Sequence, residues 1–190
     1  MKKFHISYNA PVSLTFTLLA LGATIAGIMT DGYATRLLFS VYRGSLSDPL
    51  FYLRLFTHVL GHSGMSHFTG NFTLFLLLAP MVENKFGSKQ LLWMILFTAG
   101  ITGIFSVVLF PKVALCGASG LVFMLIILSA YSFVYADGVP LTFILVAVVY
   151  IGNEITTGIL QQDNISQFAH ILGGLCGGIF GFFLRARSRR

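Results

Sequence analysis

The chain is poor in charged residues and in cysteine. Only 9% of its 190 residues are charged, whereas soluble domains of ordinary composition carry about 25%. There are too few polar side chains to cover a water-exposed globule, which excludes a soluble fold. The two cysteines, Cys116 and Cys176, lie in apolar or glycine-rich runs without metal-ligand spacing. They therefore indicate neither a disulfide framework nor a metal site.

Apolar residues are abundant in the chain. They make up 56% of the sequence and include 19 Phe. In lipid, apolar surface needs no covering and charge costs free energy, so we expect an integral membrane protein with a single domain over residues 1–190. The 12 Lys and Arg exceed the 6 Asp and Glu, but they lie in short clusters between apolar runs. This pattern predicts a role in membrane orientation and no nucleic-acid partner.

The apolar runs have the length of membrane-spanning helices. A bilayer core of about 30 Å is crossed by roughly 20 apolar residues, and six segments of the sequence fit this description. The second and fourth are short, which is permitted if their outer ends are surrounded by protein. The expected fold is an all-α bundle of six transmembrane helices over residues 12–29, 68–82, 91–110, 119–135, 141–151 and 168–184.

Basic residues predict the orientation of these spans. An even number of spans places both termini on one side, and the basic residues at positions 2–3 and 185–190 assign that side to the cytoplasm. Residues 30–66 are too polar to cross the membrane, and we expect them to form an outer loop lying partly in the interface. In a competing interpretation, residues 1–34 are a cleaved signal peptide, which N-terminal sequencing of the mature protein would detect.

Polar residues near the predicted spans are rare enough that each is a hypothesis about function. His67 and Asn71 are four residues apart and share one helix face, from which both can donate hydrogen bonds. His58 and His62 have the same spacing. Two interpretations are open for that second pair: metal ligands, for which no Cys, Asp or Glu lies close in sequence, or hydrogen bonds that hold the outer loop.

A serine flanked by glycines stands where the fourth span begins, in Gly117-Ala118-Ser119-Gly120. A serine at a helix start is by default an N-cap. Flanking glycines also allow close backbone approach, and the N–H groups of a helix start favour a developing negative charge. Ser119 is therefore also a candidate nucleophile.

His170 follows Ala169 at the outer end of a ridge of small residues, which continues through Gly173, Gly177 and Gly181. Such a ridge lets a second helix backbone approach closely. The predicted topology puts the starts of the second, fourth and sixth spans at similar depth. His170 can then act as the base for Ser119, in a dyad without an intramembrane Asp.

Taken together, these residues resemble the rhomboid family of intramembrane serine proteases. The resemblance covers nearly the whole chain and rests on His-x-x-x-Asn at 67–71, Gly-x-Ser-Gly at 117–120 and Ala-His-x-x-Gly-x-x-x-Gly at 169–177. It implies a helical bundle with a water-filled cavity, in which Ser119 is the nucleophile and His170 the base. His67, Asn71 and the Ser119 backbone N–H would form the oxyanion hole, without a metal or other cofactor.

The resemblance also implies the substrate class and the location. Other membrane proteins would be cut near the outer end of a transmembrane helix, by an enzyme in a bacterial inner membrane with cytoplasmic termini. Arg54 and the pair Glu83 and Gly87 match family positions that we expect to be structural. Two positions depart from the family: Leu53 stands where an aromatic is usual, and Phe123 where Tyr is usual.

Several assignments stay open at this stage. Glu154 and Asp163 either guard substrate access or mark where the fifth span leaves the lipid, and Gln167 and Phe168 are candidates to line the cavity. The rival function is a non-proteolytic rhomboid-like protein that binds membrane helices. A small transporter, or a haem or metal protein, is a third class. The sequence does not identify the physiological substrate or its cleavage site.

Overall fold

The fold was analysed in a computed structural model, which describes residues 7–132 and 164–188 together with positions 141, 144, 145, 148, 149, 152 and 156. Within these residues the regular elements are helices, and extended backbone pairs only at one bridge, between Val41 and Leu115. The described helices are α1 (Pro11–Met29), α2 (Tyr33–Leu38), α3 (Pro49–Thr57), the 3-10 turn η1 (His58–Leu60), α4 (Met65–Phe86), α5 (Ser88–Leu109), α6 (Ser119–Ser132) and α8 (Asn164–Ser188).

The expectation of an all-helical membrane protein is confirmed in outline. Among the described residues, four helices are long and apolar enough to cross a membrane: α1, α4, α5 and residues Ile165–Leu184 of α8. A shorter apolar helix covers Ser119–Ala130 within α6. The fifth predicted span, 141–151, lies mostly outside the described residues, as does the predicted end of the fourth. The count of six spans therefore stays a prediction.

The second predicted span, 68–82, is shorter than the helix that contains it. α4 has 22 residues and runs from Met65 to Phe86. Polar residues at its two ends, among them His67 and Glu83, interrupt the apolar run without interrupting the backbone hydrogen bonds. The expectation of a short second span was thus wrong, because the end of an apolar run was taken as the end of a helix.

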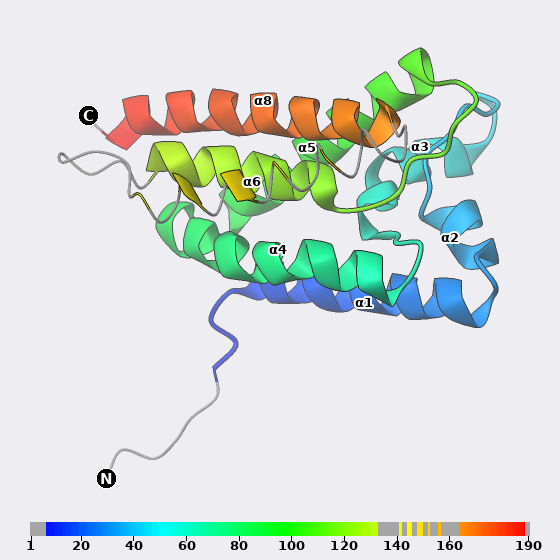
Figure 1. The fold of residues 1–190 in the computed structure, drawn as a ribbon, viewed down its shortest axis with the longest axis horizontal. Helices are drawn as coiled ribbons and strands as arrows, with labels where there is room; N and C mark the ends of the chain where they lie inside the picture. The colour runs from blue at the N-terminus through cyan, green and yellow to red at the C-terminus, as the bar shows by residue number, and fades with distance from the viewer. Residues whose placement is uncertain are drawn as a thin grey trace, which may run out of the picture.

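The arrangement of the helices places the N-terminal ends of three of them at the same end of the bundle. α4, α6 and α8 all begin at the end of the bundle that also carries α2 and α3, whereas α1 begins and α8 finishes at the opposite end (Figure 1). His67, Ser119 and His170 lie near the starts of α4, α6 and α8. Their common level, predicted from topology, is therefore present in the fold.

α1 is fastened to α4 by a buried carboxylate and by aromatic rings. Glu83 accepts hydrogen bonds from the backbone N–H groups of Val12 (2.9 Å) and Ser13 (2.8 Å) and from the Ser13 hydroxyl (2.7 Å). The N–H groups of a first helical turn have no intrahelical acceptor, and Glu83 supplies one. Further along the same contact, the Phe16 ring packs against Phe75 at 5.1 Å between centroids.

The chain between α1 and α4 is folded against the bundle. Arg54 in α3 is 3% exposed and pairs with Asp48 at 2.8 Å, with its guanidinium 4.5 Å from the centroid of the Tyr42 ring. Leu53, the neighbour of Arg54, is half exposed. This segment contains the helices α2 and α3 and the turn η1, whereas the sequence predicted only an amphipathic loop.

Candidate active site

The backbone before α6 is fixed by main-chain hydrogen bonds. Val41 and Leu115 exchange N–H···O bonds of 2.9 Å in each direction, and the Gly117 N–H donates to the His58 carbonyl, also at 2.9 Å. Gly117 has a φ of +130°, a conformation that residues with side chains rarely adopt. The backbone conformation at the first position of Gly-x-Ser-Gly therefore favours glycine.

Two side chains of α4 meet this backbone at Gly117. A Cβ added there would lie 3.0 Å from His67 Nε2 and 3.8 Å from Asn71 Nδ2. Asn71 is 4% exposed, and its Nδ2 has no hydrogen-bond partner within the described part of the chain. A buried donor without an acceptor costs free energy. This amide can therefore donate a hydrogen bond to an oxygen atom placed beside Gly117.

The ring of His67 has one nitrogen turned to the loop and the other to Gly117. The Ser63 N–H, which can only donate, lies 3.4 Å from His67 Nδ1, and the Ser63 hydroxyl lies 3.2 Å from the same atom. When Nδ1 accepts, the proton of a neutral imidazole is on Nε2. The nitrogen beside Gly117 is then a donor, as Asn71 Nδ2 is.

Ser119 is the first residue of α6 and is half-buried. The Ala118 carbonyl accepts the Val122 N–H at 3.0 Å, so Ala118, and not Ser119, occupies the N-cap position. The default interpretation of Ser119 as a helix cap is therefore wrong for this structure. Its own N–H belongs to the first turn, where amides lack intrahelical acceptors and favour negative charge.

His170 lies against the same turn of α6. Its ring stacks on the Phe123 ring with centroids 4.3 Å apart and planes 9° apart. Phe123 is four residues after Ser119, on the same helix face. The backbone of Ala169 also packs there, because a Cβ added at Gly120 would lie 3.2 Å from the Ala169 carbonyl oxygen. The imidazole is thus held beside the first turn of α6, and it is 6% exposed.

Close contact between α6 and α8 depends on two of the ridge glycines. A Cβ at Gly173 would overlap the carbonyl oxygen of Gly120, and a Cβ at Gly177 would overlap that of Met124. Gly174 and Gly178 have ordinary space, with the nearest atoms of Ile127 at 3.6 and 3.9 Å. The two helices therefore meet backbone to backbone, which the four-residue spacing predicted.

His58 and His62 are buried under this site. His58 Nδ1 lies 3.2 Å from the Arg54 carbonyl and Nε2 3.3 Å from the Thr102 hydroxyl. His62 Nε2 accepts the Ala118 N–H at 3.4 Å. Burial lowers the pKa of each imidazole to about 4, so both are neutral at pH 7. Their partners are hydrogen-bonding groups of the protein. The described residues contain no cluster of three His, Cys, Asp or Glu for a metal.

The contact of His62 with Ala118 was missed in the sequence. The two residues are 56 positions apart, and no spacing rule connects a loop histidine to a backbone amide at that separation. The signal available was the histidine itself, which is an uncommon residue in so apolar a chain.

Cys116 is a second potential nucleophile close to Ser119 in sequence. Burial raises the pKa of its thiol, and a thiol rather than a thiolate is a poor nucleophile. Ser119 is therefore the better candidate nucleophile of the two.

The remaining candidates contribute less. Phe168 packs against aromatic rings at the end of α5, with centroids 5.5 Å from Phe110 and 6.4 Å from Phe105, which is a packing contact. Gln167 is half-buried. Glu154 and Asp163 lie outside the described residues.

Comparison with known proteins gives one finding for this chain. A family model described as the Rhomboid domain matches residues 50–187. This range runs from the second residue of α3 to the next-to-last residue of α8 and includes all four candidate site residues. Curated protein sequences give no match.

Proposed function

Because this chain belongs to the rhomboid family, whose members are integral membrane proteins and typically serine proteases, we propose that it is an intramembrane serine endopeptidase. The observation that carries the proposal is a convergence on four consecutive residues, 117–120. Two hydrogen-bond donors from α4 meet Gly117, while the imidazole of α8 lies beside the turn that begins at Ser119. A nucleophile, a base and oxyanion donors are the three parts that acyl transfer needs.

In the proposed mechanism Ser119 Oγ attacks the carbonyl carbon of the scissile peptide bond, and its proton passes to His170. The carbonyl oxygen becomes an oxyanion, which receives hydrogen bonds from Asn71 Nδ2, from His67 Nε2 and from the Ser119 N–H. Collapse of this intermediate breaks the C–N bond, and His170 returns the proton to the leaving amine. Water then hydrolyses the acyl-enzyme with His170 again as the base.

Phe123 orients the base in this scheme. A carboxylate usually fixes the tautomer and the plane of a catalytic histidine, and the dyad of Ser119 and His170 has none. Stacking with centroids 4.3 Å apart keeps the plane of the imidazole nearly parallel to that of the Phe123 ring. The phenyl ring lacks the hydroxyl of the usual Tyr, so its contribution is packing alone.

The substrates we propose are transmembrane proteins cut near the outer end of a helix. A helical peptide bond is shielded by its own hydrogen bonds, so the substrate must unwind before Ser119 can reach it. The site would open to the outer face of a six-span bundle that forms one domain over residues 1–190, with both termini in the cytoplasm.

The direct test uses purified protein in liposomes with a panel of single-span substrates. Cleavage is expected with the natural chain and with Ser66→Ala, which changes an exposed serine at the start of α4. Ser119→Ala and His170→Asn should abolish cleavage, and a fluorophosphonate probe should label Ser119. Binding of membrane helices without cleavage or labelling would favour the non-proteolytic rival, and activity in Ser119→Ala would exclude the mechanism.

A further inference from the structure

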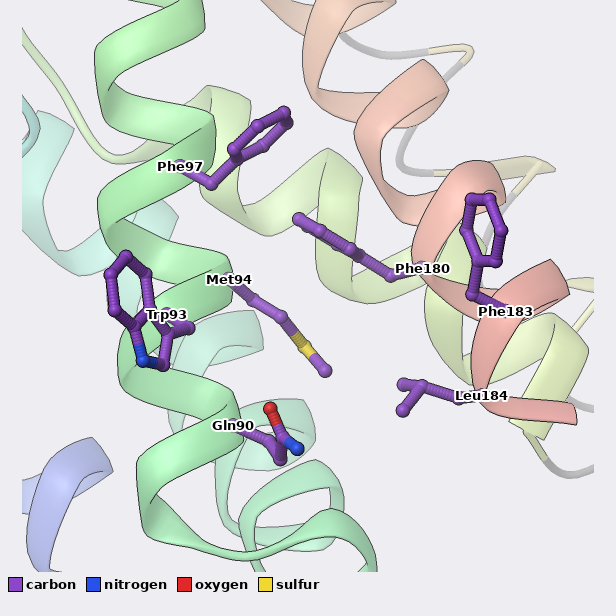
Figure 2. Close-up of a pocket in the computed structure, with 7 residues that line it drawn as sticks. All are labelled: Gln90, Trp93, Met94, Phe97, Phe180, Phe183 and Leu184. Carbon is purple, nitrogen blue, oxygen red and sulfur yellow. The ribbon is translucent and has the colours of Figure 1, made fainter. Parts of the chain in front are cut away.

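A groove between α5 and α8 lies at the end of the bundle opposite to Ser119. It has a volume of 260 Å³, and the side chains that form it come from the first turns of α5 and the last turns of α8 (Figure 2). The walls are mostly aromatic. The lining residues are Gln90, Trp93, Met94, Phe97, Phe180, Phe183 and Leu184.

The groove changes in character along its length. Its polar lining groups are the Gln90 amide and the Trp93 indole N–H, both in the first turns of α5. Lys89, beside Gln90 in sequence, is exposed. The apolar groove therefore ends, on the α5 side, beside an exposed basic residue.

We propose that this groove binds one acyl chain of an anionic phospholipid, with the phosphate at Lys89. The aromatic walls match a flexible hydrocarbon chain, and the Lys89 ammonium matches a phosphate of net negative charge. A second copy of the chain would bring its own Lys89 to the same level, which disfavours a dimer through this face. The lipid joins α5 to α8, the helix that carries His170.

Two neighbouring phenylalanines provide a matched pair for the test. Phe183 lines the groove and Phe182 does not, yet their exposed fractions are 66% and 67%. Phe183→Ala and Phe182→Ala thus each remove one phenyl ring of nearly the same exposure, and we expect little cost to folding from either. Lys89→Glu has its own control in Lys112→Glu, because Lys112 is exposed beyond the other end of α5.

The measurement is thermal unfolding of delipidated protein in neutral detergent, with phosphatidylglycerol or phosphatidylcholine of the same acyl chains, and native mass spectrometry of bound lipid. Phosphatidylglycerol should raise Tm of the natural chain and of both controls more than phosphatidylcholine does. Phe183→Ala and Lys89→Glu should bind it more weakly, by at least about fivefold for Lys89→Glu, which removes a positive charge and adds a negative one. Equal shifts with both lipids, equal loss in Phe182→Ala, or a concentration-dependent dimer crosslinked through position 183 would overturn the proposal.

A separate observation concerns His62 and rests on the proposed protease function. Since the Ala118 N–H donates to His62 Nε2 at 3.4 Å, the proton of the neutral ring is on Nδ1, which lies 3.2 Å from the Leu60 carbonyl. The tautomer is thereby fixed at both nitrogens. The same ring meets His67 edge to face, with centroids 4.9 Å apart.

From these contacts we infer that His62 is a positioning residue for the oxyanion hole. It holds the N–H of Ala118, the residue before Ser119, on one side and the His67 ring on the other, and so sets the distance between two of the three donors. Small misplacements of catalytic groups cost up to roughly 100-fold in rate. His62 itself touches neither the substrate nor the reacting atoms.

The test distinguishes a positioning role from a role in folding by asking whether a conservative substitution of His62 restores activity. His62→Ala should lower kcat per folded molecule by up to roughly 100-fold with KM nearly unchanged, and His62→Gln, whose amide can again accept the Ala118 N–H, should recover most of it. His58→Gln is the control, because the hydrogen bonds of that ring go to Arg54 and Thr102, and the carbonyl that accepts the Gly117 N–H is main chain and is kept in the variant. If His62→Ala keeps full kcat while Ser119→Ala is inactive, this inference fails and the protease function stands. An inactive natural chain would defeat both.

Discussion

On the His170 side of Ser119, α6 and α8 meet through glycines, whereas on the His67 side the chain meets α4 and its preceding loop through side-chain donors and rings. The first contact has carbonyl oxygens where any Cβ of Gly173 or Gly177 would stand. The second has imidazole and amide nitrogens around Gly117 and Ala118. The residues proposed as the base and as the oxyanion donors are thus placed by different kinds of interaction.

The two sides should respond to different substitutions. A backbone-to-backbone contact is sensitive to volume, since a single methyl group separates the helices, and it is indifferent to polarity. A hydrogen-bonded contact is sensitive to the loss of a donor or acceptor and tolerates a change of shape more easily. The predictions below test this difference, beginning with the largest effect.

The largest effect is expected at the glycines of α8. Gly173→Ala and Gly177→Ala should each destabilise the protein by about 3 kcal/mol or more, because the added methyl group overlaps a backbone carbonyl that cannot rotate away. Gly174→Ala and Gly178→Ala, one position later in each case, should be neutral or stabilise by up to about 1 kcal/mol through helix propensity. Thermal unfolding in detergent compares the four variants. Equal stability of all four variants would contradict the explanation that α6 and α8 are kept close by the absence of a Cβ at Gly173 and Gly177.

On the opposite side, Asn71→Ala and His67→Ala should leave the fold largely intact and lower kcat by about 10²- to 10³-fold each. The control is Thr73→Ala, an exposed position on the same helix. Initial rates with one substrate, normalised to folded protein, measure the effect. A large loss of Tm with unchanged kcat would show that these residues stabilise the fold and do not act in catalysis. It would contradict the proposed difference between the two sides of Ser119.

Acid should weaken the hydrogen-bonded side selectively. The folded-state pKa values of His58 and His62 are about 4, below the value of about 6.5 for an unfolded chain. Between these values the unfolded state binds more protons, so stability falls as pH falls, by up to about 1.4 kcal/mol per pH unit for each imidazole. Above pH 7 the dependence due to them should vanish.

Thermal unfolding from pH 7.5 to 4.5 measures this slope. A variant with both His58→Gln and His62→Gln should show a shallower pH dependence than the natural chain. An unchanged slope would assign the acid sensitivity to other groups.

The smallest effect is expected at Phe123, which contacts the His170 ring by stacking alone. Phe123→Leu removes a stacked ring, a contact of about 0.5–1.5 kcal/mol, and should slow cleavage severalfold without changing stability much. Phe123→Tyr retains stacking and should keep activity within a few-fold of the natural chain. A complete loss in Phe123→Leu would mean that stacking does more than orient His170.

The sequence predicted the parts of this molecule that depend on local pattern. Apolar runs located α1 and α5 closely, and four-residue spacing correctly paired His67 with Asn71 on one face and Gly173 with Gly177 on another. The ends of α4 were misplaced, since a helix continues through polar residues where an apolar run does not. The contacts of His62 with Ala118 and of Val41 with Leu115 depend on how distant segments pack, and no pattern within either segment specifies them.

Contacts of the first 49 residues reach into the site. Val41 precedes the family match over 50–187, and its two main-chain bonds to Leu115 hold the approach to α6. Thr24, also outside the match, has its hydroxyl 3.5 Å from His62 Nδ1. A fragment trimmed to the matched residues would keep every candidate site residue but would lose these supports. We therefore expect the shortest active fragment of this protein to be longer than the stretch by which its family is identified.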